Sequence, residues 1–213
     1  MSGLFITLEG VDGCGKTTQA RLLAEWLVAQ VPQPAGVLLT RQPGGTVIGE
    51  QLRELVLSPQ NHITPEAELF LYLADRAVHV AEVVVPALDR GCVVVCERYT
   101  DSTLAYQGYG RGLDLKLLRH LNEMATEGVT PDLTLVLNIP AAEVRLDASR
   151  LDRLESAGGD FRERVADGFR ALARGEPERV KILDGMQSIQ AVHEQIIALV
   201  GALLEIARPV ERP

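Results

Sequence analysis

The stretch from Glu9 to Thr18 reads EGVDGCGKTT. It matches the spacing Gly-x-x-x-x-Gly-Lys-Thr of loops that bind phosphate groups through their backbone. The apolar run Leu4–Gly10 (LFITLEG) is typical of a strand, and residues 17–31 (TTQARLLAEWLVAQV) follow with the apolar period of a helix. A glycine-rich turn between a strand and a helix presents backbone N–H groups and the helix dipole to phosphate. This context predicts a P-loop and argues against a chance match in an ordinary glycine-rich turn.

The P-loop motif assigns a role to most of its residues. Lys16 is expected to reach the β- and γ-phosphates, and the hydroxyl of Thr17 is expected to hold Mg²⁺. The glycines permit tight backbone turns and close approach of phosphate. The predicted ATP-binding residues are therefore Gly10, Val11, Asp12, Gly13, Cys14, Gly15, Lys16, Thr17 and Thr18.

Strands and helices alternate along the rest of the chain. The expected strands are 4–10, 37–40, 92–98, 132–140 and 179–184, and the expected helices are 17–31, 46–57, 64–84, 115–126, 161–174 and 189–207. Most of the strands are continuous apolar runs, which is typical of a parallel sheet buried on both faces. The sequence thus predicts an α/β fold in which helices cover both faces of a five-stranded parallel sheet, in a single domain spanning residues 1–213.

Composition narrows the class of protein. Hydrophobic residues make up 46% of the 213 residues and the net charge is −8, so neither disorder nor a nucleic-acid or anionic-membrane partner is expected. No apolar run has the length of a membrane span, and the N-terminus lacks the pattern of a signal peptide. Cys14, Cys92 and Cys96 fit neither a disulfide framework nor a zinc site. These observations favour the cytoplasm.

The residues after the third expected strand distinguish among P-loop proteins. No Asn-Lys-x-Asp follows a strand, so a guanine-reading GTPase is not indicated, and the Asp-Glu pair of a helicase is absent from this position. Instead the strand ends in Glu97-Arg98. Glu97 can orient Mg²⁺ or its waters, and Arg98 can lie between two anionic phosphates. A structural ion pair is the alternative interpretation of these two residues.

Five segments occur in an order that resembles a known family: GVDGCGKTTQ, TRQPGGT, ERYTDSTLAYQGYGRG, PDLTLVLNIP and DRLE. From Phe5 to about Ile196 the chain resembles the bacterial thymidylate kinases, which are P-loop nucleoside monophosphate kinases. The resemblance implies a P-loop kinase fold with a short lid and Mg²⁺-dependent phosphoryl transfer from ATP to dTMP, giving dTDP and ADP for dTTP synthesis. It also implies a homodimer. The highly charged segment at about 147–160, which contains Gly158-Gly159 and lacks a clear apolar face, corresponds to the lid and is expected to be exposed and mobile.

The resemblance also assigns residues to the acceptor nucleotide. It places Asp12 near the sugar and Arg41 on the acceptor phosphate. It implies a substrate-facing role for Arg53 and for Arg98, although a solvated helix arginine is an equal alternative for Arg53. Family members often have Glu where this chain has Gln42, which removes a charge.

The thymine base is assigned to the helix at 64–84. The resemblance implies that Arg76 donates to a thymine carbonyl and that Tyr72, one helical turn earlier, stacks on the base; a core aromatic is the alternative for Tyr72. His79 lies three residues after Arg76, and we interpret it as merely lining the helix. The remaining dTMP contacts implied by the family are Ser102 and Thr103 near the base, Tyr106 against C2′ of the sugar, and Gln107 on base or phosphate.

The catalytic cations are expected to come from three places. The variable positions of the P-loop contain no arginine, and family members of this kind carry catalytic arginines in the lid. Arg153 in DRLE fits the family pattern best, Arg150 lies three residues earlier, and Arg145 is a weaker candidate. Lys16, Arg98 and a lid arginine are then expected to surround the transferring group, and no general base is needed because the acceptor oxygen is already anionic. Two alternatives stay open: another small-molecule P-loop kinase, and a non-catalytic nucleotide-dependent switch.

Overall fold

Five parallel strands lie side by side in the order β2-β3-β1-β4-β5. The structure, a computed structural model, describes residues 3–31, 36–144, 152–154 and 158–207. The strands are β1 (Leu4–Glu9), β2 (Val37–Arg41), β3 (Val93–Glu97), β4 (Leu133–Asn138) and β5 (Val180–Asp184). Each one falls on a segment that the sequence predicts as a strand, because uninterrupted apolar runs suit a sheet that is buried on both faces.

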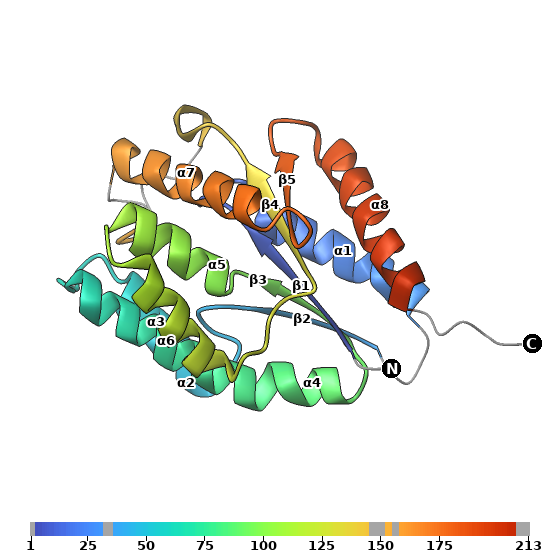
Figure 1. The fold of residues 1–213 in the computed structure, drawn as a ribbon, viewed down its shortest axis with the longest axis horizontal. Helices are drawn as coiled ribbons and strands as arrows, with labels where there is room; N and C mark the ends of the chain where they lie inside the picture. Colours follow the sequence, from blue (N-terminus) through green and yellow to red (C-terminus); the bar gives the residue numbers. More distant parts are fainter. Residues whose placement is uncertain (1–2, 32–35, 145–151, 155–157, 208–213) are drawn as a thin grey trace, which may run out of the picture.

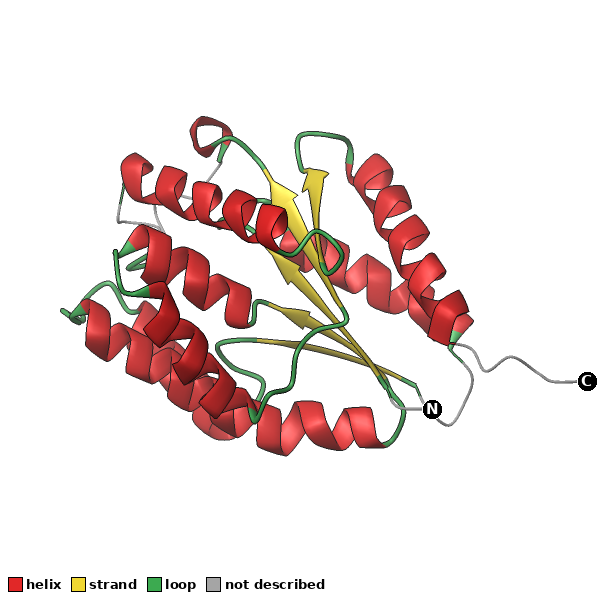
Figure 2. Cartoon of the chain, in the orientation of Figure 1, coloured by secondary structure: helices red, strands yellow, loops and turns green. Residues whose placement is uncertain are grey.

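Helices cover both faces of this sheet (Figures 1 and 2). The α-helices are α1 (Lys16–Gln30), α2 (Val47–Leu57), α3 (Pro65–His79), α4 (Val85–Asp89), α5 (Thr100–Thr103), α6 (Leu115–Thr126), α7 (Gly159–Gly175) and α8 (Ile189–Ala207). Two π-helical segments, η1 (Val80–Val84) and η2 (Leu104–Gly110), and a 3₁₀ turn, η3 (Ala141–Glu143), complete the described elements. The predicted α/β class is confirmed. No helix in the described ranges combines the length and apolar character that crossing a bilayer requires.

Two stretches differ from the sequence-based expectation. The helix predicted over 64–84 ends as an α-helix at His79, passes through η1 and continues as α4. Pro86 has no N–H with which to continue the normal hydrogen-bond ladder, and the N–H of Val85 bonds to Val80, five residues back. The sequence also predicts no helix between Arg98 and Leu115, where α5 and η2 lie.

The alternation of side chains along β1 divides the interior into two layers. Ile6 and Leu8 belong to a cluster that includes apolar residues of α1 and α8. Phe5 faces the other way and packs with Val84 of η1 and Tyr99. Helices close both layers.

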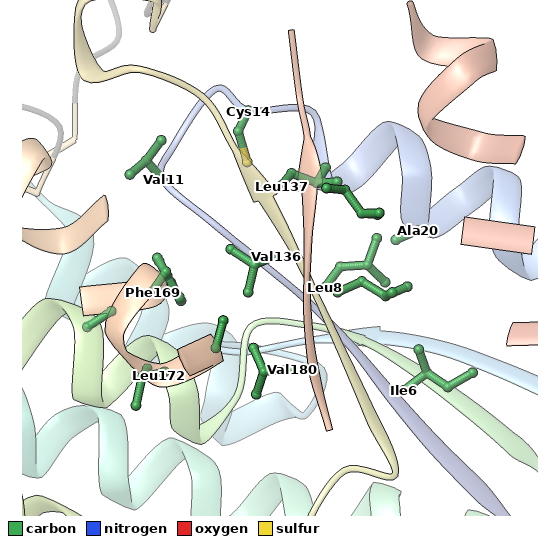
Figure 3. Packing of buried hydrophobic residues seen from close by; sticks show 14 of the residues in the cluster. Ile6, Leu8, Val11, Cys14, Ala20, Val136, Leu137, Phe169, Leu172 and Val180 are labelled. Atoms are coloured by element: carbon green, nitrogen blue, oxygen red, sulfur yellow. The ribbon is translucent and has the colours of Figure 1, made fainter. Parts of the chain in front are cut away.

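The P-loop is anchored in this core by two of its own side chains. Val11 and Cys14 are buried and belong to the same cluster as strand β4 and helix α7 (Figure 3). In that view Leu8 and Leu137 lie toward Ala20 of α1, whereas Val136 lies toward Phe169 of α7. The variable positions of the loop therefore hold its backbone in place against the carboxyl ends of β1 and β4.

Candidate active site

The carboxyl edge of the sheet brings the predicted site residues together, as expected for ligand sites of parallel α/β proteins. The P-loop follows β1, Arg41 ends β2 and Glu97 ends β3. Gly10 opens the loop at φ 135°, and a Cβ atom there would lie 2.5 Å from the carbonyl oxygen of Leu137. Only glycine fits at this position, so the loop approaches β4 closely.

Lys16 is buried inside the curve of the P-loop. Its ammonium donates to the carbonyl oxygens of Gly10 at 3.1 Å and Val11 at 2.8 Å. These bonds hold a positive charge at the centre of the loop. The ammonium can exchange its carbonyl partners for phosphate oxygens, which are stronger acceptors because they are charged.

The two residues predicted to hold Mg²⁺ contact each other. The hydroxyl of Thr17 donates to Oε2 of Glu97 at 2.8 Å. Both groups offer the oxygen ligands that Mg²⁺ prefers, and this ion is usually bound by one or two protein oxygens together with water and substrate phosphates. The donor set therefore fits Mg²⁺.

Asp12, Arg98 and Tyr106 form a network between the P-loop and the residues after β3. Arg98, in the left-handed conformation at φ 65°, forms an ion pair with Asp12. The hydroxyl of Tyr106 donates to Oδ2 of Asp12 at 2.9 Å and accepts from Nη2 of Arg98 at 3.1 Å. Arg98 thus pairs with the P-loop rather than with its neighbour Glu97.

The charges in this network stabilise one another. Burial by itself raises the pKa of Asp12, but the positive charges of Arg98 and Lys16 outweigh it and lower that pKa to about 2. Burial opposes the charge on Arg98, whereas Asp12 raises the pKa of its guanidinium well above the ordinary value. Both groups therefore stay ionised at neutral pH.

Two adjoining cavities open around this network. We call the first the nucleoside cavity and the second the P-loop cavity. Asp12, Gln42, Arg53 and Arg98 line both. The predicted dTMP residues that line the nucleoside cavity are Asp12, Arg53, Tyr72, Arg76, Arg98, Ser102, Thr103, Tyr106 and Gln107. The P-loop cavity is lined by Gly13, Gly15, Lys16, Thr17 and Thr18 together with Arg41 and Glu97.

Known proteins share this chain's sequence and fold. A family model described as thymidylate kinase matches residues 8–196. The chain belongs to the thymidylate kinase family. It is 47% identical to a thymidylate kinase of an Exiguobacterium strain over 92% of this chain and 93% of that protein, and 49% identical to one from Clavibacter sepedonicus over 96% and 97%. A crystal structure of thymidylate kinase from Ehrlichia chaffeensis is similar with a TM-score of 0.79 and 34% identity, covering 94% of this chain and 99% of that one.

Arg76, the residue that the thymidylate kinase resemblance assigns to the base, is buried and held on all sides. Its guanidinium donates to Oε1 of Gln42 at 2.9 Å, to Thr103 and Asn122 at 2.6 Å each, and to the carbonyl oxygen of Tyr99 at 2.9 Å. These bonds fix the guanidinium at the wall of the nucleoside cavity. The contact with Asn122 was not anticipated, because nothing in the sequence relates α6 to the base.

Arg41, which the resemblance assigns to the acceptor phosphate, and Arg53, to which it assigns a substrate-facing role, differ in their surroundings. Arg41 is exposed and binds both carboxylate oxygens of Glu50 at 3.0 Å. Arg53 donates to the carbonyl oxygen of Pro43 at 2.9 Å, and burial together with the charge of Arg41 lowers its pKa. Arg53 is therefore a partly desolvated cation between the two cavities, and the alternative of a freely solvated helix arginine does not describe it.

Glu68 is a buried acid that the sequence reasoning treated only as a charge near the start of a helix. It is fully buried and accepts from the amide of Gln107 at 2.7 Å and from Arg111 at 2.9 Å. It also forms an ion pair with Arg153 at 2.6 Å. The spacing of four residues to Tyr72 was the signal available in the sequence, because it places Glu68 on the same helical face.

The lid falls only partly within the described residues. Arg145 and Arg150 lie outside them. Arg153 binds Glu68 and also donates from its backbone N–H to Leu57 at 3.0 Å and from Nε to Val56 at 2.9 Å. It does not line the P-loop cavity, and the neighbouring Leu154 is buried. Residues 152–154 of the lid are thus packed against α2 and α3, where the sequence predicted an exposed segment. Leu154 supplies an apolar contact there that the charge content of the segment does not indicate. Residues 158–160 are exposed, as the sequence predicted.

Glu9, the last residue of β1, is a second buried acid that supports the site and that was not predicted from the sequence. Its buried carboxylate accepts from the N–H of Tyr99 at 2.7 Å, and from the N–H of Ser102 at 3.3 Å and its hydroxyl at 2.6 Å. Burial and the nearby charge of Asp101 raise the pKa of Glu9 to about 7. A titrating carboxyl group thus holds the segment that carries Ser102 and Thr103.

We predict that Glu9→Gln changes how stability depends on pH. The folded pKa of Glu9 lies above its ordinary value of 4.5, so between these values the folded state keeps a proton that the unfolded state has lost, and stability falls as pH rises. Glutamine keeps a carbonyl oxygen that can accept from the N–H groups of Tyr99 and Ser102, its amide can donate to the hydroxyl of Ser102, and it does not titrate. Urea unfolding from pH 4.5 to 8 should show the variant gaining stability relative to wild type as pH rises through 7, whereas Glu123→Gln, on the exposed face of α6, should show no such trend. Parallel curves for wild type and Glu9→Gln would contradict the assignment.

Proposed function

We propose that the P-loop cavity binds ATP and the nucleoside cavity binds dTMP, with Asp12 and Arg98 between them. As a thymidylate kinase, the chain phosphorylates dTMP with ATP to give dTDP. The observation that carries the assignment of the two cavities is that they adjoin and share Asp12, Arg53 and Arg98. A donor phosphate held by the P-loop and an acceptor phosphate at the shared wall can then meet in line.

The residues around the shared wall act by position and charge. The acceptor is an anionic phosphate oxygen, so no base has to remove a proton. Lys16 binds the donor phosphates, and Arg98 lies between donor and acceptor. Arg53, together with Arg41 once it leaves Glu50, binds the acceptor phosphate. Because these cations lie in a partly closed site, their attraction for phosphate is less screened than in water.

Mg²⁺ is proposed as the metal that accompanies ATP. Thr17 would bind it directly and Glu97 would orient it directly or through water, which the 2.8 Å contact between the two supports. When bound, the ion supplies positive charge to the donor phosphates. The contribution of the chain itself is to hold the Thr17 hydroxyl and the Glu97 carboxylate on the same side of the P-loop.

Tyr106 is proposed to select a deoxyribose. Its ring is buried between Phe161 and Phe169, and its hydroxyl is fixed by Asp12 and Arg98. A ring that cannot move leaves little room for an added 2′-hydroxyl against its face. This role also depends on Asp12, which holds the ring through its hydroxyl.

The function is tested by incubating the protein with ATP, Mg²⁺ and a panel of nucleoside monophosphates. We expect dTDP from dTMP at a much higher kcat/KM than any product from AMP or CMP, and no dTDP when a chelator removes Mg²⁺. Lys16→Ala should lose nearly all transfer because the P-loop loses its central cation, whereas Lys116→Ala, on the exposed face of α6, should retain it. Preference for AMP or CMP, or full activity of Lys16→Ala, would contradict the proposal.

The lid arginines are separated by comparing Arg150→Ala with Arg153→Ala. Removing an arginine from a phosphoryl-transfer site costs roughly 10³-fold or more in rate. Because Arg153 is bound to Glu68 and Val56, we expect the large loss of kcat in Arg150→Ala and mainly a raised KM for dTMP in Arg153→Ala. A large loss of kcat in Arg153→Ala at unchanged KM would instead indicate that Arg153 is the catalytic arginine of the lid, as the family pattern suggests. The ion pair between Arg153 and Glu68 would then have to break during turnover.

We further propose that the chain forms a homodimer through α2 and α3. Phe70 on α3 is 60% exposed, and Ile48 on the adjacent α2 is 50% exposed. Light scattering should give twice the 23.2 kDa of one chain for wild type. Phe70→Asp should shift the mass toward the monomer, because it places a charge in an apolar contact, whereas Val28→Asp, on exposed α1, should not. A monomeric wild type would rule out the dimer.

A further inference from the structure

A chain of buried polar groups lies behind Arg76. Nε of Arg76 is 2.9 Å from Oε1 of Gln42, Nε2 of Gln42 is 2.9 Å from Nδ1 of His79, and Nε2 of His79 is 2.6 Å from the hydroxyl of Thr40. None of the four residues is more than 9% exposed. Water therefore does not replace a missing partner here, and each group depends on its neighbour in the chain.

The chemistry of the donors determines the direction of every bond. A guanidinium can only donate, so Oε1 of Gln42 must accept from Arg76. The amide NH₂ of Gln42 then faces His79, and Nδ1 of His79 must accept from it. The imidazole is therefore neutral, with its hydrogen on Nε2, and donates to Thr40. No other arrangement of hydrogens satisfies all three contacts.

The surroundings of His79 favour this neutral ring in one orientation. Burial and the positive charge of Arg76 lower the pKa of His79 to about 4. Gly45 lies against the ring at φ 78°, where a Cβ atom would come within 2.7 Å of Cδ2. The ring is thus confined between a glycine backbone on one side and the Gln42–Arg76 pair on the other.

We propose that His79 and Gln42 are positioning residues for Arg76. His79, with its hydrogen on Nε2, orients the amide of Gln42, and the carbonyl oxygen of that amide holds Nε of Arg76 at the wall of the nucleoside cavity. This corrects the interpretation of His79 as a residue that merely lines its helix. The effect on dTMP binding rests on the proposed function, whereas the hydrogen-bond chain itself does not.

The proposal also relates Gln42, which stands where family members often have a glutamate, to the protonation of His79. A glutamate there would have no hydrogen to give to His79, so Nδ1 would have to carry one in order to keep the contact. Glutamine and a ring protonated only on Nε2 therefore belong together in this chain. Changing one of them alters the hydrogen-bonding state that the other requires.

The first test reads the tautomer of His79 by NMR of protein labelled with ¹⁵N-histidine, with His79→Asn identifying the signal. We expect the Nε2–H neutral form at pH 7. Gln42→Glu should place a hydrogen on Nδ1, seen as the other tautomer or as the imidazolium. An Nδ1–H ring in wild type, or the same spectrum in Gln42→Glu, would overturn the proposal whether or not the protein is active on dTMP.

The second test compares two variants of similar size. The side-chain oxygen of Asn in His79→Asn can replace Nδ1 as the acceptor for Gln42, whereas the longer amide of His79→Gln replaces Nε2 as the donor to Thr40. We expect KM for dTMP within about twofold of wild type for His79→Asn and about three- to tenfold higher for His79→Gln, with KM for ATP unchanged in both. Thermal unfolding of both variants measures the loss of stability that they share. Equal KM values for dTMP in the two variants would overturn the positioning role, since a purely structural residue would not distinguish them.

Discussion

The ion pair between Asp12 and Arg98 joins the two halves of the site. Asp12 belongs to the P-loop after β1, and Arg98 follows β3 in a left-handed conformation. Each would be costly to bury alone, because an uncompensated charge loses its hydration. Paired, and bonded in addition to Tyr106, they form a charged wall that both cavities share. The position of this pair therefore sets where the P-loop ends and where the nucleoside cavity begins.

Helix α3 organises the opposite wall by its periodicity. Glu68, Tyr72, Arg76 and His79 follow one another at spacings of three or four residues and so share one face. Glu68 contacts the lid, Tyr72 lines the nucleoside cavity, Arg76 binds Thr103, and His79 contacts β2. Because all four side chains lie on one rigid helix, their positions relative to one another are fixed, as they would not be on a flexible loop. The helix ends at the last of them, where η1 and Pro86 redirect the chain.

The strands and helices with strong local sequence patterns were predictable from the sequence. The elements whose conformation depends on tertiary contacts were not. All five strands follow from their apolar runs, and the P-loop follows from its glycines and Lys16. The segment from Thr100 to Gly110 has no helical period, and it becomes helical because Glu9 binds its first turn and Tyr106 packs against α7. Likewise, Glu68 and His79 have partners more than 30 residues away in sequence, so the helical spacing can place them on one face of α3 but does not reveal what they bind. The family motifs identified the residues that line the cavities, but not the buried groups that hold them.

The distribution of charge reconciles an acidic protein with two anionic substrates. The chain carries a net charge of −8, yet the cations Lys16, Arg41, Arg53, Arg76 and Arg98 line the two cavities with fewer acids among them. Screening in salt limits the reach of the surface charge to about 10 Å, so a phosphate at the carboxyl edge of the sheet is attracted mainly by these nearby cations. Concentrating the arginines at one edge thus allows the site to select small phosphates by the shape of its cavities as well as by charge.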